Sequence, residues 1–282
     1  MRTLALLLFS ACALFAAPPE KKTSARGLTY HVHLPDKYVK GQHPLFFALH
    51  GAGGNGDNMM RWITGPQSTI PKEAVIVAPT ASQNGEWDNP DMDPLVDLVK
   101  AVKAEYAPTR TVLTGFSRGG YWTFYLGTAH PQLFDAAIPC SGGLPGIMPD
   151  NDDVRRLPFY VIHGEADDVV PISESERSVK SLEKVYVTVK FERIPGLKHD
   201  IDWAAFKRGL DWANGILDER QKKLDDEVGK KITELEGKLK EKAWQDAAGL
   251  ISSIQRVPAT RTIWLTTTKN RPKAMKPPCA AA

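Results

Sequence analysis

The sequence contains little cysteine and almost no imbalance of charge. Only three of its 282 residues are cysteines, too few for a fold built on disulfides. Its 36 basic residues nearly match its 33 acidic ones, and a net charge of +3 gives no sign of a nucleic-acid partner. With 42% hydrophobic and 24% charged residues, the chain has the composition of a globular protein, which excludes wholesale disorder and collagen-like repeats.

A hydrophobic run stands at the very start of the chain. Arg2 precedes apolar residues 4–15, and small residues follow. This pattern is typical of a secretory signal, and the run is too short for a good membrane span. We therefore expect residues 1–17 to be a signal peptide, cleaved after Ala13 or Ala16, and the protein to be secreted or periplasmic.

Lipid attachment at Cys12 is the alternative for this segment. Residues 9–12 loosely resemble a bacterial lipoprotein box, but Phe9 at its first position and the apolar residues after Cys12 argue against it. Of the other two cysteines, Cys140 follows a predicted strand and Cys279 lies in the tail. A buried thiol and a tail thiol are therefore favoured over a disulfide.

Residues 18–217 alternate between strand and helix patterns. Continuous apolar runs such as 45–49 are typical of parallel strands that are buried on both faces. This alternation predicts an α/β fold with a doubly wound, mostly parallel sheet, and residues 18–217 as its domain. The predicted strands cover residues 28–34, 45–49, 74–78, 111–114, 136–138, 159–162 and 185–194, and the predicted helices cover residues 94–106, 119–130, 174–184 and 202–217.

The composition changes after Leu217. Residues 218–257 are rich in both acidic and basic side chains, with apolar residues at helical spacing in two stripes that are offset near residues 241–243. We expect a helical hairpin there. Residues 258–282 carry five basic residues and no acidic ones, and we expect a basic, partly disordered tail. The hairpin and tail are candidates for contact with a protein or the cell envelope.

A serine lies in the pattern Gly-x-Ser-x-Gly where a predicted strand meets a predicted helix. Gly115, Ser117 and Gly119 occupy its fixed positions. A sharp turn of this kind lifts the hydroxyl above the sheet, and glycines on both sides avoid a clash. Ser117 is therefore a candidate nucleophile.

Such a serine needs a base and an acid that orients the base. Three histidines follow Ser117: His130, His163 and His199. His130 ends the helix that starts at the nucleophile turn and so points away. Catalytic groups in open α/β sheets gather beyond the carboxyl ends of the strands, which favours His199 as base and Asp167 as its partner.

A glycine-rich loop, residues 50–56, follows the buried strand 45–49. Its backbone N–H groups match the oxyanion-hole loop of lipases and esterases. It also resembles a phosphate loop, but the Lys-Ser/Thr ending is missing, so we favour the oxyanion interpretation. The sequence indicates no cofactor and no metal site, and we interpret His31 and His33 as a surface pair.

Four motifs together resemble those of the α/β-hydrolase superfamily. They are Leu49-His-Gly-Ala-Gly-Gly54, Gly115-Phe-Ser-Arg-Gly-Gly120, His163-Gly-x-x-Asp167-x-x-Val-Pro171 and Gly196-x-x-His199. Within that superfamily the chain is similar to secreted carboxylesterases related to polyhydroxybutyrate depolymerases, feruloyl esterases and the phospholipase/carboxylesterase group. The likeness covers residues 28–217.

The resemblance implies a role for each matching residue. Ser117 attacks an ester carbonyl, His199 takes its proton, and Asp167, with Asp168 as the alternative, orients the imidazole. The backbone N–H groups of Arg118 and Ala52 form the oxyanion hole. His163 is implied to be structural.

Two further side chains are candidates near the cleft. Trp87 lies in a loop after a strand, where it could stack on substrate. Arg118 replaces the neutral residue that many relatives have, and its guanidinium could favour an anionic substrate or form a structural salt bridge.

The expected function is therefore hydrolysis of a small-molecule or polymeric carboxylic ester through an acyl-enzyme. Two alternatives remain open. One is a serine peptidase of the prolyl-oligopeptidase type, although only about 26 residues separate the signal from the first motif strand, too few for the usual extra domain. The other is a non-catalytic hydrolase-fold module tethered to a partner through the hairpin.

Overall fold

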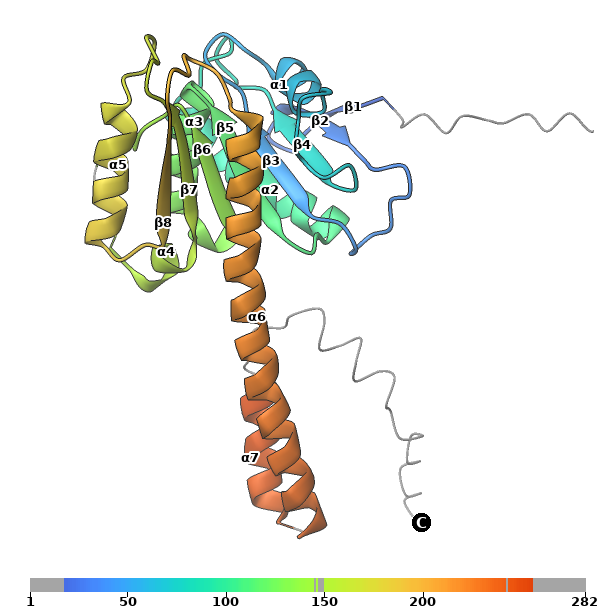
Figure 1. Cartoon of the computed structure of the whole chain (residues 1–282). Helices are drawn as coiled ribbons and strands as arrows, with labels where there is room; N and C mark the ends of the chain where they lie inside the picture. The colour runs from blue at the N-terminus through green and yellow to red at the C-terminus, as the bar shows by residue number, and fades with distance from the viewer. Residues whose placement is uncertain (1–17, 145, 147–149, 242, 256–282) are drawn as a thin grey trace, which may run out of the picture. The chain divides into compact units, whose positions relative to one another are not determined.

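The computed structural model describes residues 18–144, 146, 150–241 and 243–255 (Figure 1). The chain divides between Ala213 and Asn214 into two compact units. The predicted signal peptide (residues 1–17) and basic tail (residues 258–282) lie outside the described residues, as do Cys12 and Cys279.

The first unit is built on one eight-stranded sheet, in the spatial order β1-β2-β4-β3-β5-β6-β7-β8. β2 pairs antiparallel with β1 and β4, and all other neighbours are parallel. This confirms the predicted doubly wound, mostly parallel α/β sheet. The strands are β1 (Glu20–Thr23), β2 (Thr29–His33), β3 (Leu45–Leu49), β4 (Val75–Pro79), β5 (Thr111–Phe116), β6 (Ala136–Cys140), β7 (Phe159–Gly164) and β8 (Val189–Ile194).

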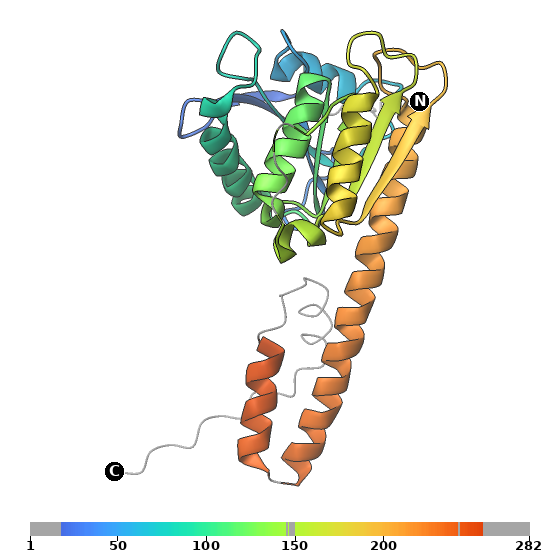
Figure 2. The ribbon, with the colours of Figure 1, turned by 90° about the vertical axis from the view of Figure 1, so that its left-hand side faces the viewer.

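Helices cover both faces of the sheet, as the connections between parallel strands require. The helices of the first unit are α1 (Gly56–Ile63), α2 (Met92–Tyr106), α3 (Arg118–Ala129), α4 (Asp152–Arg156), α5 (Ser173–Lys184) and the start of α6 (Trp203–Lys240), with short 3₁₀ turns η1 (Asn89–Asp91) and η2 (Pro131–Leu133). The second unit holds the rest of α6 and α7 (Trp244–Gln255). Figure 2 shows α2, α3 and α5 in front of the sheet.

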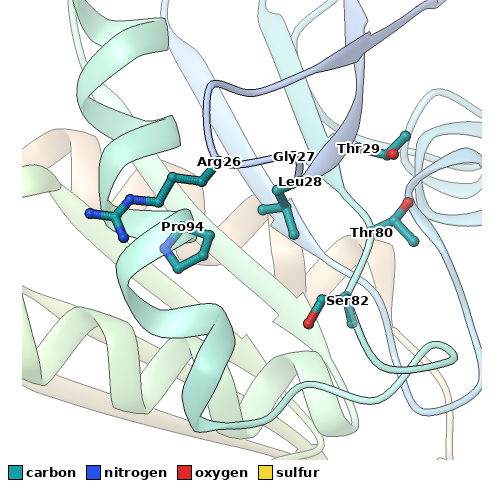
Figure 3. Close-up of a pocket in the computed structure, with 8 residues that line it drawn as sticks. Arg26, Gly27, Leu28, Thr29, Thr80, Ser82 and Pro94 are labelled. Carbon is teal, nitrogen blue, oxygen red and sulfur yellow. The ribbon is translucent and has the colours of Figure 1, made fainter.

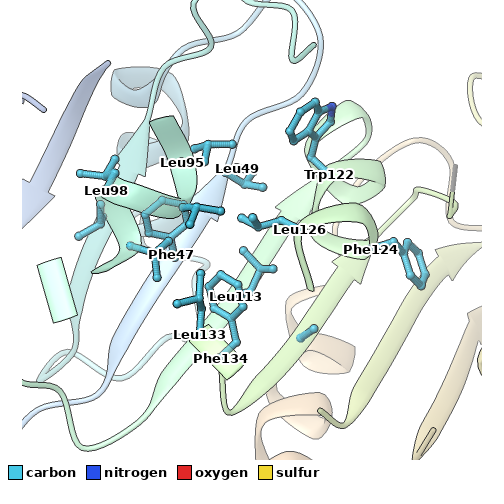
Figure 4. Packing of buried hydrophobic residues seen from close by; sticks show 14 of the residues in the cluster. Phe47, Leu49, Leu95, Leu98, Leu113, Trp122, Phe124, Leu126, Leu133 and Phe134 are labelled. Atoms are coloured by element: carbon cyan, nitrogen blue, oxygen red, sulfur yellow. The ribbon is translucent and has the colours of Figure 1, made fainter. Parts of the chain in front are cut away.

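The alternation of side chains along the central strands divides the core into two layers. Phe47 and Leu49 of β3 belong to one core cluster with residues of α2, α3 and α5, such as Leu95 and Leu126 (Figure 4). Phe46 points to the other face, where α1 and the first turns of α6 cover it. All five residues of β3 are buried, which explains its continuous apolar sequence.

Several elements differ from the sequence-based expectation. β8 begins at Val189 rather than at residue 185, because α5 ends through a left-handed Tyr186 (φ 61°) and the N–H of Val187 donates back to Leu182. This reversal is a helix C-cap, so these residues cannot continue as a strand. β1, α1 and α4 were not predicted.

The second unit is a helical hairpin, in agreement with the predicted fold class. α6 does not stop at Leu217 but continues to Lys240, and α7 begins at Trp244. Val228 of α6 and Ala247 of α7 are buried in this unit. Ion pairs at i,i+4 spacing, such as Glu219–Lys223 (2.7 Å), explain the mixed charge.

Among the described residues, no helix combines the length and the apolar composition needed to cross a membrane.

Candidate active site

The candidate residues follow the carboxyl ends of parallel strands. The loop with His50 and Ala52 follows β3, Ser117 follows β5, Asp167 comes shortly after β7, and His199 comes shortly after β8. Because these strands run in the same direction, their ends lie at one edge of the sheet (Figure 1). This is the edge where open α/β sheets bind ligands.

Ser117 occupies a strained turn between β5 and α3. Its φ of 57° and ψ of −119° are unusual for a residue with a side chain. A Cβ on Gly115 would lie 2.3 Å from the carbonyl oxygen of Gly119, and one on Gly119 would lie 2.1 Å from that of Leu49. Both glycines are therefore needed for the close approach of β5, α3 and β3 that forms this turn.

Asp167 and His199 are joined by hydrogen bonds. Nδ1 of the imidazole lies 2.8 Å from Oδ2 and 3.0 Å from Oδ1 of the carboxylate. Since a carboxylate accepts, Nδ1 carries the proton and Nε2 is left as the basic nitrogen. On its other side the ring of His199 lies 4.6 Å from that of Phe116, the residue before Ser117.

The Asp167 carboxylate is held in its charged form. Burial of the side chain raises its pKa, but hydrogen bonds from His199 and from the N–H groups of Val170 and Val169 outweigh burial, so the pKa lies below its ordinary value. Asp168, the alternative acid, is exposed. The residue that contacts His199 is Asp167.

His163 lies behind the loop that carries Asp167 and contacts it. Its ring is completely buried, with Nε2 2.8 Å from the carbonyl oxygen of Val170 and 3.3 Å from Oδ2 of Asp167. Nδ1 lies 2.7 Å from Oγ of Ser175. Burial lowers the pKa of His163 below its ordinary value. These contacts give His163 a place behind Asp167, as the sequence resemblance implied.

Gly164 lets the loop of His199 approach the acid loop. A Cβ at this position would lie 2.1 Å from the carbonyl oxygen of Leu197. The same oxygen accepts a hydrogen bond from the N–H of Ala166 (3.0 Å). The glycine of the His-Gly-x-x-Asp motif thus brings together the two loops that carry Asp167 and His199.

The glycine-rich loop runs directly beside Ser117. A Cβ on Gly51 would lie 3.4 Å from Cβ of the serine, so the backbone leading to Ala52 passes against the nucleophile turn. Arg118 is the first residue of α3, where a backbone N–H has no partner within the helix. Two candidate oxyanion donors therefore flank Ser117 on separate segments.

His50 fixes the conformation of this loop. Its Nδ1 donates to the carbonyl oxygen of Gly51 (2.7 Å), and its Nε2 accepts from the N–H of Ala81 (3.0 Å). Both bonds are satisfied by one neutral tautomer. Burial lowers the pKa of His50 below its ordinary value, which favours that neutral form. The bond to Gly51 orients the peptide whose N–H belongs to Ala52.

Trp87 is buried behind the loop rather than exposed to substrate. Its side chain is 0% exposed, stacks on the ring of His50 (4.6 Å between centroids) and donates Nε1–H to the His50 carbonyl oxygen (2.9 Å). The expectation that it stacks on substrate is therefore corrected. An indole can fill the core from a loop as readily as line a cleft, and the sequence does not distinguish the two.

The side chain of Arg118 turns onto the loop of Trp87. Nη2 donates to the Trp87 carbonyl oxygen (3.0 Å), and Nε lies 3.9 Å from a carboxylate oxygen of Glu86. These contacts correspond to the structural salt bridge, and the Arg118 side chain remains 47% exposed.

The glycines of residues 51–56 also have the spacing Gly-x-Gly-x-x-Gly, which sequence reasoning overlooked. In the structure each has a local reason. Gly51 lies against Ser117, and Gly53 has a φ of 67°. A Cβ on Gly56 would lie 2.2 Å from the carbonyl oxygen of Ala78. The spacing therefore follows from how this loop packs around the serine and enters α1.

A separate cavity of about 250 Å³ lies near the start of β2 and the end of β4, and none of the candidate catalytic residues lines it (Figure 3). Arg26, Thr29, Thr80 and Ser82 contribute its polar groups. Within the described residues no group of three or more His, Cys, Asp or Glu side chains is placed to hold a metal ion.

Cys140 ends β6 and is 1% exposed. Burial raises the pKa of its thiol well above the ordinary value. Because the thiolate is the reactive form, Cys140 is a packed side chain rather than a nucleophile.

Comparison with known proteins adds independent findings. Residues 91–210 match the protein family described as Phospholipase/Carboxylesterase. A carboxylesterase of Bacillus cereus has a similar structure, with a TM-score of 0.55 and 18% identity over 67% of this chain and 94% of that one. At this identity the likeness concerns the fold.

Two curated relatives match parts of the sequence. A bifunctional acetylxylan esterase/xylanase of Neocallimastix patriciarum is 26% identical over 57% of this chain and 24% of its own length. An acyl-protein thioesterase 1 homolog of Dictyostelium discoideum is 36% identical over 36% of this chain and 48% of its own. The chain thus spans less than half the length of these relatives.

Proposed function

We propose that the chain belongs to the α/β-hydrolase superfamily and hydrolyses carboxylic esters with Ser117 as nucleophile. The observation that carries the proposal is the hydrogen bond from His199 to Asp167, on the sheet edge where Ser117 stands in its strained turn. A hydroxyl, an oriented imidazole and a buried carboxylate are the groups that acyl transfer needs.

The first half-reaction forms an acyl-enzyme. Because Nδ1 of His199 is bonded to Asp167, Nε2 takes the proton of the Ser117 hydroxyl as Oγ attacks the ester carbonyl. The carbonyl oxygen becomes an oxyanion, which the N–H groups of Ala52 and Arg118 stabilise. The C–O bond to the alcohol then breaks, and Nε2 returns the proton to the leaving oxygen.

The second half-reaction repeats these steps with water. Nε2 removes a proton from the water molecule that attacks the acyl carbon, and Oγ of Ser117 leaves with that proton. Throughout, the charged Asp167 stabilises the imidazolium that forms on His199. His50 and Trp87 support the oxyanion loop and take no direct part.

The names of the relatives extend the range of substrates to examine. An acetylxylan esterase removes acetyl groups from a polysaccharide, and an acyl-protein thioesterase acts on acyl thioesters. We propose a carboxylic ester or thioester, from a small molecule or a polymer, as the substrate class of this chain.

We also propose that the protein acts outside the cytoplasm, from the signal-like sequence of residues 1–17. The hairpin is the part of the chain that we propose for contact with a protein or the envelope. Leu239, Trp244 and Ile251 are exposed apolar residues of this unit.

Hydrolysis of p-nitrophenyl acetate by the wild type, Ser117→Ala and His199→Ala tests the proposed activity. We expect each substitution to reduce kcat by about 10⁴-fold or more. Circular dichroism of the variants should match the wild type. If properly folded variants and the wild type hydrolyse the ester equally fast, Ser117 and His199 do not carry the hydrolysis and the proposed site is wrong.

A further inference from the structure

A cluster of aromatic rings lies beside His199. The ring of Phe116 is 4.6 Å from the imidazole and 5.1 Å, edge to face, from the indole of Trp62 in α1. That indole in turn lies 5.7 Å, edge to face, from Trp203, the first residue of α6. Three segments far apart in the sequence thus supply one aromatic wall, defined here as Trp62, Phe116 and Trp203.

The aromatic wall is only partly buried. All three of its side chains keep an intermediate exposure, whereas Phe206, which packs behind Trp203, is completely buried. Partly exposed large aromatic rings leave some apolar surface in contact with water, and a ligand that covers this surface gains from the hydrophobic effect. The contact with His199 places this apolar surface next to the reacting groups.

The chemistry of His199 indicates which part of an ester meets the wall. The imidazole must return its proton to the leaving oxygen, so the alcohol group of the substrate lies on the side of His199. The carbonyl oxygen instead points to the N–H groups of Ala52 and Arg118. Since Phe116 packs on the imidazole itself, the wall borders the alcohol side.

We propose that the aromatic wall is a subsite for an aromatic alcohol group of the ester, an inference that rests on the proposed function. The rings of the wall already contact one another edge to face, and an added aromatic ring extends these contacts. A saturated ring of similar size covers the same area but lacks the edge and face charges that favour such geometry.

The test compares esters that differ only in this ring. Benzyl acetate and cyclohexylmethyl acetate have alcohol groups of similar size, and methyl acetate has no ring. For the wild type we expect kcat/KM to be about 3- to 10-fold higher for the benzyl than for the cyclohexylmethyl ester. Trp62→Leu should bring this ratio close to one and reduce the ratio of benzyl acetate to methyl acetate.

Trp212→Leu is the matched control. Trp212 is also a partly exposed tryptophan of α6, but it packs on Tyr160 at 5.5 Å. The Trp212→Leu variant should keep the wild-type kcat/KM ratios for the three acetates. A second ester pair, methyl phenylacetate and methyl cyclohexylacetate, moves the ring to the acyl side, where Trp62→Leu should leave the ratio unchanged.

Two results with an active enzyme would overturn the subsite. One is an unchanged ratio of the alcohol pair in Trp62→Leu, and the other is a loss of discrimination only for the acyl pair. If no ester is hydrolysed, the proposed function fails on its own. The subsite is then tested by the binding of benzyl alcohol. Benzyl alcohol should then shift an indole N–H signal in the NMR spectrum that Trp62→Leu removes, and no shift would refute the subsite.

Discussion

The carboxylate of Asp167 lies 2.8 Å from Nδ1 of His199, although 32 positions separate them in the sequence. The contact depends on Gly164, which allows the backbone near Leu197 to approach. The hydrogen bond selects the tautomer that leaves Nε2 free to act as a base.

Asp167→Asn should lower kcat for ester hydrolysis by about 10³- to 10⁴-fold, because an amide stabilises neither the required tautomer nor the imidazolium. Asp168→Asn is the matched control and should change kcat less than about threefold, because Asp168 is exposed and lies outside the bond to His199. Steady-state kinetics on both variants measure the difference. A larger loss in Asp168→Asn would assign the acid role to the neighbour.

Gly119→Ala should destabilise the protein by about 3 kcal/mol, because the new Cβ would lie 2.1 Å from the carbonyl oxygen of Leu49. Gly215→Ala provides the contrast. No atom lies within 4 Å of a Cβ at this position of α6, so alanine should stabilise the helix by about 0.5–1 kcal/mol. Urea denaturation followed by circular dichroism compares the two, and equal effects would contradict the packing described for the nucleophile turn.

Trp87→Phe should lower stability and kcat but leave KM nearly unchanged. Phenylalanine keeps a ring against His50 but removes the hydrogen bond to the His50 carbonyl oxygen, at a cost of about 1–3 kcal/mol. The loss of kcat would come from a looser oxyanion loop. An increase in KM at constant kcat and stability would instead restore the rejected view that Trp87 stacks on substrate.

The unfolding free energy should fall as the pH drops below about 6.5, the ordinary pKa of histidine. The pKa of His50 is lowered by burial in the folded state, so in this range the unfolded chain binds a proton that the folded chain does not. His50 therefore contributes full stability above pH 6.5, and this contribution is lost progressively toward its lowered pKa. Burial also lowers the pKa of His163, so its contribution to stability is likewise lost as the pH falls.

His50→Asn should make this pH dependence shallower, because one of the groups that takes up a proton on unfolding is gone. Urea denaturation at several pH values between 5 and 7 measures the slope for both proteins. An identical slope in the variant would mean that His50 does not titrate differently in the two states.

The placement of Ser117, Asp167 and His199 after strand ends was predictable, because each lies in a local sequence pattern next to a predicted strand. Helix α1 was missed although its signals are present: Asn55 caps it by accepting from the N–H of Asn58, and Met59, Met60 and Ile63 have helical spacing. The helix was missed because the glycine-rich sequence before it is typical of a loop. The end of the first unit at Ala213 lies inside α6, where no stop signal marks it.

Other features depend on tertiary contacts that no local pattern reports. The position of Trp87 behind His50 is set by which side of the loop faces the core, and the sequence is compatible with either. The contact of Phe116 with Trp62 and His199 joins three segments that only the fold brings together. The same holds for His163, whose contacts with Val170 and Ser175 assign it to the support of Asp167.

Covalent labelling of Ser117 tests the central claim most directly. A fluorophosphonate reacts with a serine hydroxyl that a neighbouring base activates, and peptide mass spectrometry identifies the modified residue. We predict a single adduct on Ser117 in the wild type, and its absence in His199→Ala with the fold intact. An adduct on a different serine, or none on Ser117 in the folded wild type, would contradict the assignment of this edge of the sheet as a hydrolytic site.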